Sequence, residues 1–291
     1  MEDNSRSKLR LIHNRVISEA EIKVLYPDEI KEGVDVLATE SPLDLSLRYW
    51  GGTQWLTHQY SVLMRTPGAD RNLVLGLLFA EGIISEADQV EKIQLIDNAF
   101  EEEKIDKAIV FLSKQCSFSP TANNRNLISN SSCGFCGKDT LESLQHSCYI
   151  LPRIGIQLEK NAIWNLKGQL INEQSAFNLT GGIHAVAAVN AQGEIEVLKE
   201  DVGRHNALDK VVGCLLEEGQ APFTNKALLL SGRASFEMVH KAMMAGFPVV
   251  IAIGAPSSMA VDFAEENNMT LIGFLKENRM NIYSAQQRVV F

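Results

Sequence analysis

The sequence predicts an α/β protein in which a mixed C-terminal sheet carries helices on both faces and follows a smaller N-terminal α+β domain. The C-terminal half alternates apolar runs with amphipathic helical patterns in the order ββαβαβαβ. These runs are continuously apolar, as in strands that are covered on both faces. The chain has 291 residues, of which 45% are hydrophobic, enough to form one large or two medium domains.

The N-terminal part gives fewer clear elements. Residues 1–60 contain only short extended runs and a turn-like ESPLD. A strand is predicted over Tyr60–Arg65, and the TPG turn ends it. An amphipathic helix should follow, with Asp70 as its cap and Gly82 as its stop. The runs IQLID and AIVFL predict two further strands.

A polar stretch separates the two parts of the chain. Half of the residues from Ser113 to Ser132 are Ser or Asn, which is typical of a loop or domain linker. We therefore expect a domain boundary here, with an N-terminal domain over residues 1–125 and a C-terminal domain over residues 126–291.

The C-terminal elements follow one another with clear stops. The runs IHAVAAV and EIEVL should form a hairpin across NAQG, and Gly246 and Pro248 separate a helix from the next strand. The remaining predicted elements are a helix from about Gly203 to Glu217, strand KALLL, a helix over Phe236–Ala245, strand PVVIAI, a helix over Met259–Glu266 and strand MTLIGFL.

Charge and cysteine content limit the class of protein. Lys and Arg number 27 against 36 Asp and Glu, so a net charge of -9 disfavours nucleic acid as a partner. The most apolar stretch, Ala242–Pro256, is interrupted by Gly and Pro and is too short to span a membrane. No secretory signal is visible, and five cysteines do not suggest a disulfide framework. A cytoplasmic location is therefore expected.

Two thiols at the end of the polar stretch offer reactive chemistry. The sequence SSCGFCGK places Cys133 and Cys136 three positions apart, which suits half a zinc site, a disulfide switch or a sulfur carrier. Structural zinc is disfavoured, because Cys148 lies on the apolar stripe of a predicted helix and His146 lies about 160° away from it. A disulfide switch of the thioredoxin kind would follow a strand, whereas a polar loop precedes this pair.

The sulfur-carrier interpretation fits the surroundings of the pair best. A persulfide carrier must meet a donor and then an acceptor, and thiols beside a long polar loop suit both encounters. Gly134 and Gly137 free backbone N–H groups, and Lys138 would favour the thiolate. The second thiol could resolve the persulfide by forming a disulfide.

Three loops that follow strands are suited to an anionic ligand. They are Glu200–Lys210, Ser231–Glu237 and Gly254–Ala260, and each opens a predicted helix. In an open α/β sheet such loops converge on one edge. The candidate binding residues are Arg204, His205, Ser231, Arg233 and Ser257. Simple alternatives remain: a helix cap by Ser235, a helix cap by Ser257 or Ser258, and an i,i+4 pair between His205 and Asp209.

A basic stretch follows the last predicted strand. In FLKENR, Lys276 and Arg279 could reach phosphate or guanine carbonyl groups, and the alternative is a solvated basic turn. Together with the preceding motifs, this stretch resembles the formate dehydrogenase accessory sulfurtransferases of the FdhD type. The matching pieces are VLMRTPGADRNLVLGLLFAEGII, SSCGFCG, TGGIHAVA, EDVGRHNALDKVVG, LLLSGRASFEMVHKAMMAGFPVVIAIGAPSSMAVDFA and MTLIGFLKENRMNIYS.

The resemblance implies a sulfurtransferase that takes sulfur from a cysteine desulfurase. It would pass the sulfur to molybdenum bis(molybdopterin guanine dinucleotide), the cofactor that formate dehydrogenase needs. By similarity the persulfide forms on Cys133, with Cys136 in a less defined role. Guanine nucleotides such as GDP would mimic the cofactor. The implied cofactor-binding residues are Phe274, Leu275, Lys276, Glu277, Asn278 and Arg279.

The resemblance also implies a C-terminal domain of the cytidine-deaminase-like fold and a homodimer. Deaminase zinc chemistry is not carried over, because the H-x-E and P-C-x-x-C order is absent, and no structural zinc is expected. FLKENR also lacks a glycine that is common in the family. Two rival functions stay open: a dithiol–disulfide oxidoreductase, and a chaperone that binds the cofactor without thiol chemistry.

Overall fold

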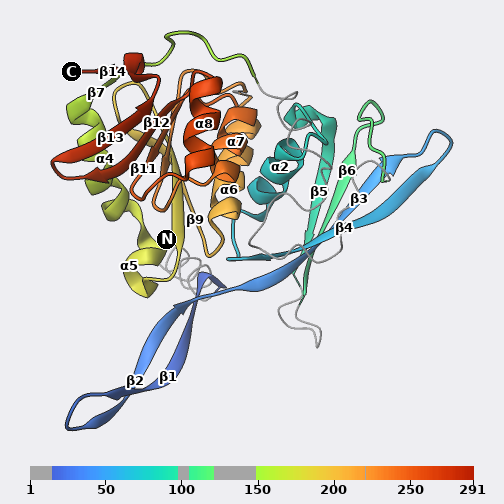
Figure 1. Cartoon of the computed structure of the whole chain (residues 1–291). Coiled ribbons are helices and arrows are strands. Elements are labelled where there is room, and N and C mark those ends of the chain that lie inside the picture. Colours follow the sequence, from blue (N-terminus) through green and yellow to red (C-terminus); the bar gives the residue numbers. More distant parts are fainter. Residues whose placement is uncertain (1–14, 98–104, 121–148, 220) are drawn as a thin grey trace, which may run out of the picture.

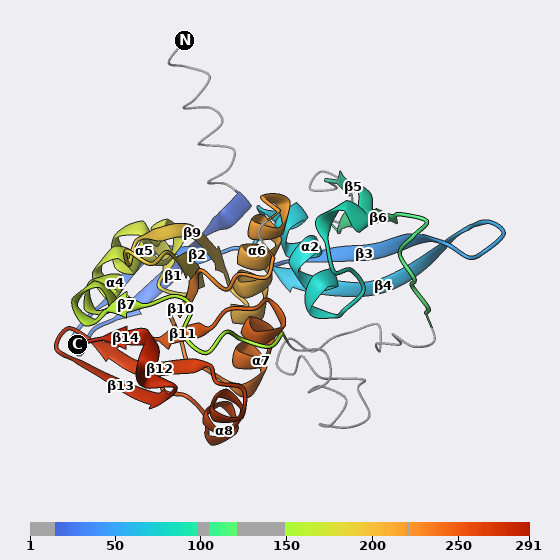
Figure 2. The same ribbon diagram turned by 90° about the horizontal axis from the view of Figure 1, so that it is seen from above.

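The computed structural model describes residues 15–97, 105–120, 149–219 and 221–291. It has two main sheets with a layer of helices between them, seen from the front in Figure 1 and from above in Figure 2. The predicted mixed α/β class is confirmed. The deaminase-like detail and the domain boundary stay predictions.

The N-terminal sheet has four strands in the order β4-β3-β6-β5. These strands are β3 (Ser41–Trp50), β4 (Trp55–Arg65), β5 (Val90–Ile96) and β6 (Asp106–Leu112). A separate hairpin of β1 (Ile17–Leu25) and β2 (Ile30–Ala38) projects away from the body of the molecule (Figure 1). Strands β1 to β3 lie in residues 1–60, where the sequence had shown only short extended runs, and the turn expected at ESPLD is wrong, because β3 begins at Ser41.

Helix α2 (Asp70–Ala80) covers this sheet, and its predicted cap is wrong. The N-cap position is held by Ala69 in a left-handed conformation, with φ of 53°. The Asp70 carboxylate instead accepts a hydrogen bond of 2.9 Å from Nε of the buried Arg65. A buried guanidinium requires a carboxylate partner, and this need outweighs capping.

The C-terminal sheet has six strands in the order β13-β12-β11-β10-β8-β9. Strands β10, β11 and β12 run parallel, and the others pair antiparallel with their neighbours. The strands are β8 (His184–Val189), β9 (Ile195–Asp201), β10 (Ala227–Leu230), β11 (Val249–Ala252), β12 (Thr270–Lys276) and β13 (Arg279–Ser284). All the strands predicted here are confirmed, and β13 is an addition that the sequence analysis lacked.

Helices cover both faces of this sheet, as predicted. Three lie on the side of the N-terminal sheet: α6 (Arg204–Glu217), α7 (Phe236–Met244) and α8 (Ser258–Glu266). The opposite face is covered by α4 (Lys160–Glu173), which is followed by the short helix α5 (Ser175–Thr180).

The alternation along each strand explains this double cover. In β10, Leu228 and Leu230 pack into the core shared with α6 and the N-terminal sheet. Their neighbours Ala227 and Leu229 pack into the core under α4. Successive side chains of a strand point to opposite faces, so a continuous apolar run needs apolar partners on both sides.

The remaining described elements are short. Strand β7 (Leu158–Glu159) pairs in parallel with β14 (Val289–Val290), which brings the C-terminal end of the chain beside the start of α4. Two 3-10 turns complete the set, η1 (Ala87–Gln89) and η2 (Gln286–Arg288).

Candidate functional site at the sheet edge

The three predicted loops meet at one edge of the C-terminal sheet. Ser231 N donates to Ala185 O at 3.0 Å, Gly254 N to Gly232 O at 2.9 Å, and Phe274 N to Gly254 O at 2.9 Å. These bonds join the ends of β10, β11 and β12 to the start of β8. The first loop lies at the same edge, because Asp201 at the end of β9 pairs with His184 at the start of β8. The predicted convergence of the loops is therefore confirmed, while their role in ligand binding stays a prediction.

The second and third loops pack closely against each other. A β-carbon on Gly254 would lie 2.9 Å from Gly232 O and 3.1 Å from Arg233 N, so this position has no room for a side chain. The Arg233 side chain remains exposed beside the contact. The close packing of the two backbones thus fixes the position from which the Arg233 side chain extends into solvent.

The two serine caps behave differently. Ser257 Oγ accepts from Ala260 N at 3.3 Å, so Ser257 is the cap of α8, and the other candidate, Ser258, is the first residue of the helix. Ser235 occupies the N-cap position of α7, but its hydroxyl makes no capping bond, so this predicted cap is wrong. In the described part of the chain, Ser235 Oγ is a buried atom without a hydrogen-bond partner.

The predicted i,i+4 pair between His205 and Asp209 is wrong, because both residues face α7. His205 Nε2 lies 2.8 Å from Glu237 Oε2, although the imidazole is poorly aligned for a full hydrogen bond. Asp209 accepts from Lys241 Nζ at 2.7 Å through both carboxylate oxygens. Two cross-helix pairs thus tie the start of α6 to α7.

The imidazoles in this cluster are held neutral. Burial, followed by the positive charges of Lys241 and Arg204 and by neighbouring His184, lowers the pKa of His205 to about 3. Burial and Arg204 also lower the pKa of His184, against an opposing effect of Asp201. At neutral pH both rings can therefore donate or accept one hydrogen bond without carrying charge.

The start of α6 is anchored to the N-terminal part of the chain. Lys210 Nζ lies 2.7 Å from Asp201 Oδ2 and donates to Thr66 O at 2.8 Å. Asn206 Nδ2 donates to Met64 O at 2.8 Å. The TPG turn after β4 thereby fixes the loop that carries Arg204 and His205.

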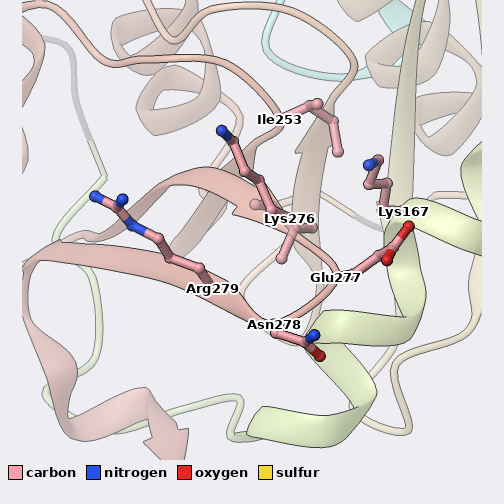
Figure 3. A pocket seen from close by; sticks show the side chains of 7 residues that line it. Lys167, Ile253, Lys276, Glu277, Asn278 and Arg279 are labelled. Atoms are coloured by element: carbon pink, nitrogen blue, oxygen red, sulfur yellow. The ribbon is translucent and has the colours of Figure 1, made fainter.

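A pocket of about 470 Å³ opens at the turn between β12 and β13. Its lining residues are Lys167, Ile253, Leu275, Lys276, Glu277, Asn278 and Arg279. Figure 3 shows Lys276 and Arg279 leaving the turn, with Lys167 reaching across from α4. Three cations against one carboxylate make this a site that favours anions.

This pocket contains part of the predicted set. Five of the six FLKENR residues line it, while Phe274 does not. Phe274 instead sits in β12 with a positive φ of 53°. The stretch is a hairpin turn between two strands, which accounts for its exposed charges. Of the predicted residues, Arg204, His205, Ser231, Arg233 and Ser257 belong to the neighbouring loops and are not among the lining residues described above.

Lys167 is the lining cation that the sequence analysis missed. It belongs to α4, far from the turn in sequence, and helix α4 itself had not been predicted. The apolar pattern of Ile163, Leu166 and Leu170 could have revealed the helix. No local signal could have placed Lys167 opposite the turn.

Cys133 and Cys136 lie outside the described residues, as do His146 and Cys148. The described chain resumes at Tyr149, which packs against the core shared by the two sheets. In the described ranges, no three His, Cys, Asp or Glu side chains come together as metal ligands. The expectation about zinc at the thiol pair stays a prediction.

Comparison with known proteins decides the family. A model of the FdhD/NarQ family matches residues 38–290. The chain belongs to the FdhD/NarQ family. The sulfur carrier protein FdhD of Saccharolobus solfataricus is 38% identical over 88% of this chain and 91% of its own. The protein of the same name from Nocardia farcinica is 39% identical, over 88% of each chain.

A solved structure shows the same fold as this FdhD/NarQ chain. It is described as a formate dehydrogenase accessory protein from Desulfotalea psychrophila. The TM-score is 0.71 with 21% identity, over 94% of this chain and 100% of that chain. Among the helices that the structure describes, none has the length and apolar character needed to cross a membrane.

Proposed function

We propose that this chain is a sulfur carrier that loads a molybdenum cofactor for formate dehydrogenase. The observation that carries the proposal is the anion-favouring pocket built from the FLKENR turn in a protein whose net charge is -9. A negatively charged nucleotide cofactor needs such a local group of donors. Membership of the FdhD/NarQ family and the names of the relatives support the sulfur chemistry.

In the first step Cys133 receives the sulfur. Its thiolate attacks the outer sulfur of a persulfide on a cysteine desulfurase. A new S–S bond forms on Cys133, the donor's S–S bond breaks, and the donor thiolate leaves. The step is an exchange without net oxidation.

In the second step Cys136 releases the sulfur. Its thiolate attacks Cys133 Sγ, a disulfide forms between the two residues, and the outer sulfur leaves as hydrosulfide. The dithiol supplies the two electrons that turn sulfane sulfur into sulfide. The cofactor, held by its nucleotide end in the pocket, would take up this sulfide as a ligand of the molybdenum.

Mass spectrometry after incubation with a cysteine desulfurase and cysteine tests the first step. We expect a gain of one sulfur atom on Cys133, lost in Cys133→Ala and kept in the control Cys214→Ala. A loss of two hydrogen atoms, which marks a disulfide, without added sulfur would instead support a dithiol–disulfide oxidoreductase.

The Cys136→Ala variant tests the second step. It should load sulfur normally but release sulfide only when an external dithiol is added. A complementation assay completes the test: if Cys133→Ala still restores formate dehydrogenase activity in a strain lacking this protein, the chain acts as a binding chaperone and the sulfur route is wrong.

A further inference from the structure

Arg204, the first residue of α6, carries a guanidinium that no described residue binds. The side chain is half-buried, and its Nε atom is shielded from solvent without a hydrogen-bond partner in the described chain. The buried Arg65 and Arg288 differ from it: Arg65 binds two carboxylates, and Arg288 binds three backbone carbonyls and a hydroxyl. A shielded donor without an acceptor is unfavourable, so Arg204 points to an acceptor that a ligand supplies.

The carboxylates of this cluster are engaged elsewhere. Asp201 and Asp209 each pair with a lysine at 2.7 Å. The Glu237 carboxylate lies beside the His205 ring, with 2.8 Å between Oε2 and Nε2. The charge of Glu237 offsets part of the charge of Arg204, so we expect an anion to bind here weakly and mainly through hydrogen bonds.

His184 supplies a second free group beside Arg204. It begins β8, is partly buried, and its ring has no hydrogen-bond partner among the described residues. Burial, and then the charge of Arg204, lowers the pKa of the ring, so the two groups lie close together and the ring is uncharged at neutral pH. A neutral imidazole retains one N–H donor, which can bind the same anion as the guanidinium.

Gly232 leaves one edge of the His184 ring open. A β-carbon on Gly232 would lie 3.5 Å from Nδ1 and 3.6 Å from Cε1, and no other described atom lies within 4 Å of that position. The space where a side chain would stand therefore borders the imidazole alone. A small ligand can use this space, whereas any residue larger than glycine would cover the ring.

This cluster is separate from the pocket at the β12–β13 turn. Strands β10 and β11 lie between β8 and β12 in the sheet. With neighbouring strands about 4.8 Å apart, His184 lies about 14 Å along the same edge from the end of β12. A long ligand bound at the turn could reach the cluster with its far end.

We propose that Arg204 and His184 form a second anion site, which binds a small oxyanion. The oxyanion has two possible sources: a free ion such as molybdate, or the molybdenum end of the cofactor, whose oxygen ligands offer the same acceptors. The second source rests on the proposed function, in which the nucleotide end of that cofactor occupies the pocket. The first source does not depend on it.

NMR titration of the full chain with sodium molybdate at constant ionic strength tests the site, because the His184 ring signals report binding there. We expect a Kd on the order of 1 mM in the wild type. Arg204→Met keeps the aliphatic part of the side chain and should weaken binding roughly tenfold. The control Arg48→Met, an exposed change on strand β3, should bind molybdate like the wild type.

Gly232→Ala tests whether the open edge of His184 is used. Gly232 does not have a positive φ and its β-carbon would make an ordinary contact, so the variant should fold normally and bind molybdate roughly fivefold more weakly. The control Gly33→Ala, whose β-carbon would lie 3.8 Å from Ile22, should bind like the wild type.

Glu237→Gln gives a result of opposite sign. Removal of this negative charge should strengthen molybdate binding roughly threefold. A purely structural role of the cluster would predict no such gain. Weaker or unchanged binding in Glu237→Gln would therefore contradict an anion site at this place.

The molybdenum content of protein purified from cells that make the cofactor identifies the source. If Arg204→Met binds GDP like the wild type but retains less molybdenum, the cofactor supplies the oxyanion. If it retains the wild-type molybdenum content but binds added molybdate more weakly, the source is a free ion. Equal molybdate binding by Arg204→Met and the wild type, or none by the wild type at about ten times the expected Kd, overturns the site.

The proposed function is tested apart from this site. Failure of the desulfurase to load sulfur on Cys133 of the wild type would overturn the proposed function. Molybdate binding that depends on Arg204 would stand in that case as a separate result, with a free oxyanion as its source.

Discussion

Gly76 of helix α2 lies against Asp209 of helix α6 so closely that a β-carbon on Gly76 would be 1.9 Å from the Asp209 carbonyl oxygen. The reverse contact is equally tight, because a β-carbon on Gly213 would be 1.9 Å from Asn72 O. The two helices therefore touch backbone to backbone. This contact joins the N-terminal sheet to the helix that carries His205 and Asp209.

Gly76→Ala should separate the two helices and destabilise the protein. Alanine favours a helix over glycine, but the clash is with backbone atoms that cannot rotate away, so we expect a loss of about 3 kcal/mol in the free energy of unfolding. Gly168→Ala is the matched control: a β-carbon there meets nothing within 4 Å, and we expect a gain of about 0.5–1 kcal/mol. Urea denaturation measures the free energy of unfolding of both variants. A Gly76→Ala protein as stable as the wild type would contradict the close contact.

Asp201→Asn should be among the most destabilising conservative changes. Asp201 and Lys210 are almost fully buried, with 2.7 Å between Oδ2 and Nζ. Removing one charge leaves the other buried without compensation, which costs about 3–5 kcal/mol. Glu29→Gln breaks a pair with Lys31 at the same 2.7 Å distance, but on the exposed hairpin, and should cost less than about 1 kcal/mol. Similar losses in the two variants would contradict this account.

The sequence predicted the central strands well and their polar contacts poorly. Runs such as ALLL and VVIA must be buried on both faces, so composition alone identifies them. The partner of His205 was predicted within its own helix, but it is Glu237 of the next helix. Helix periodicity specifies which residues share a face, while the packing of another helix decides what that face meets.

The pocket at the β12–β13 turn likewise combines a segment that the sequence predicted with a partner that it did not. The FLKENR turn was predicted as a ligand contact, and it lines a pocket. The opposite wall comes from Lys167, whose position depends on how α4 packs across the sheet. Local patterns identify reactive segments, whereas the distances between such segments are a property of the whole fold.

Acid should destabilise the protein partly through His205. In the folded state its pKa is lowered to about 3 from an ordinary value of 6.5, so between these values only the unfolded state binds the proton. Stability from this residue is complete above about pH 6.5 and is lost as the pH falls towards 3. The carboxylate of Glu237 favours the charged ring and reduces the loss.

Urea titrations at several pH values measure this effect. Between about pH 7 and pH 4.5, His205→Gln should lose roughly 1–2 kcal/mol less stability than the wild type. His58→Gln, a change in strand β4 far from this cluster, should follow the wild-type curve. Identical pH curves for His205→Gln and the wild type would mean that His205 is solvated in the folded state.

The Cys116 thiol should be unreactive towards alkylating reagents in the native protein. Its side chain is buried, its thiol donates to Ile83 O at 3.2 Å, and burial raises its pKa, so little reactive thiolate forms at neutral pH. Iodoacetamide should therefore leave Cys116 unmodified until denaturant is added, as peptide mass spectrometry can show. Cys116→Ala should cost about 1–2 kcal/mol of stability through the lost contact and should not alter sulfur loading. Rapid labelling of Cys116 would contradict its burial. Reduced loading in a folded Cys116→Ala protein would mean that a thiol other than the pair at Cys133 and Cys136 takes part in sulfur transfer.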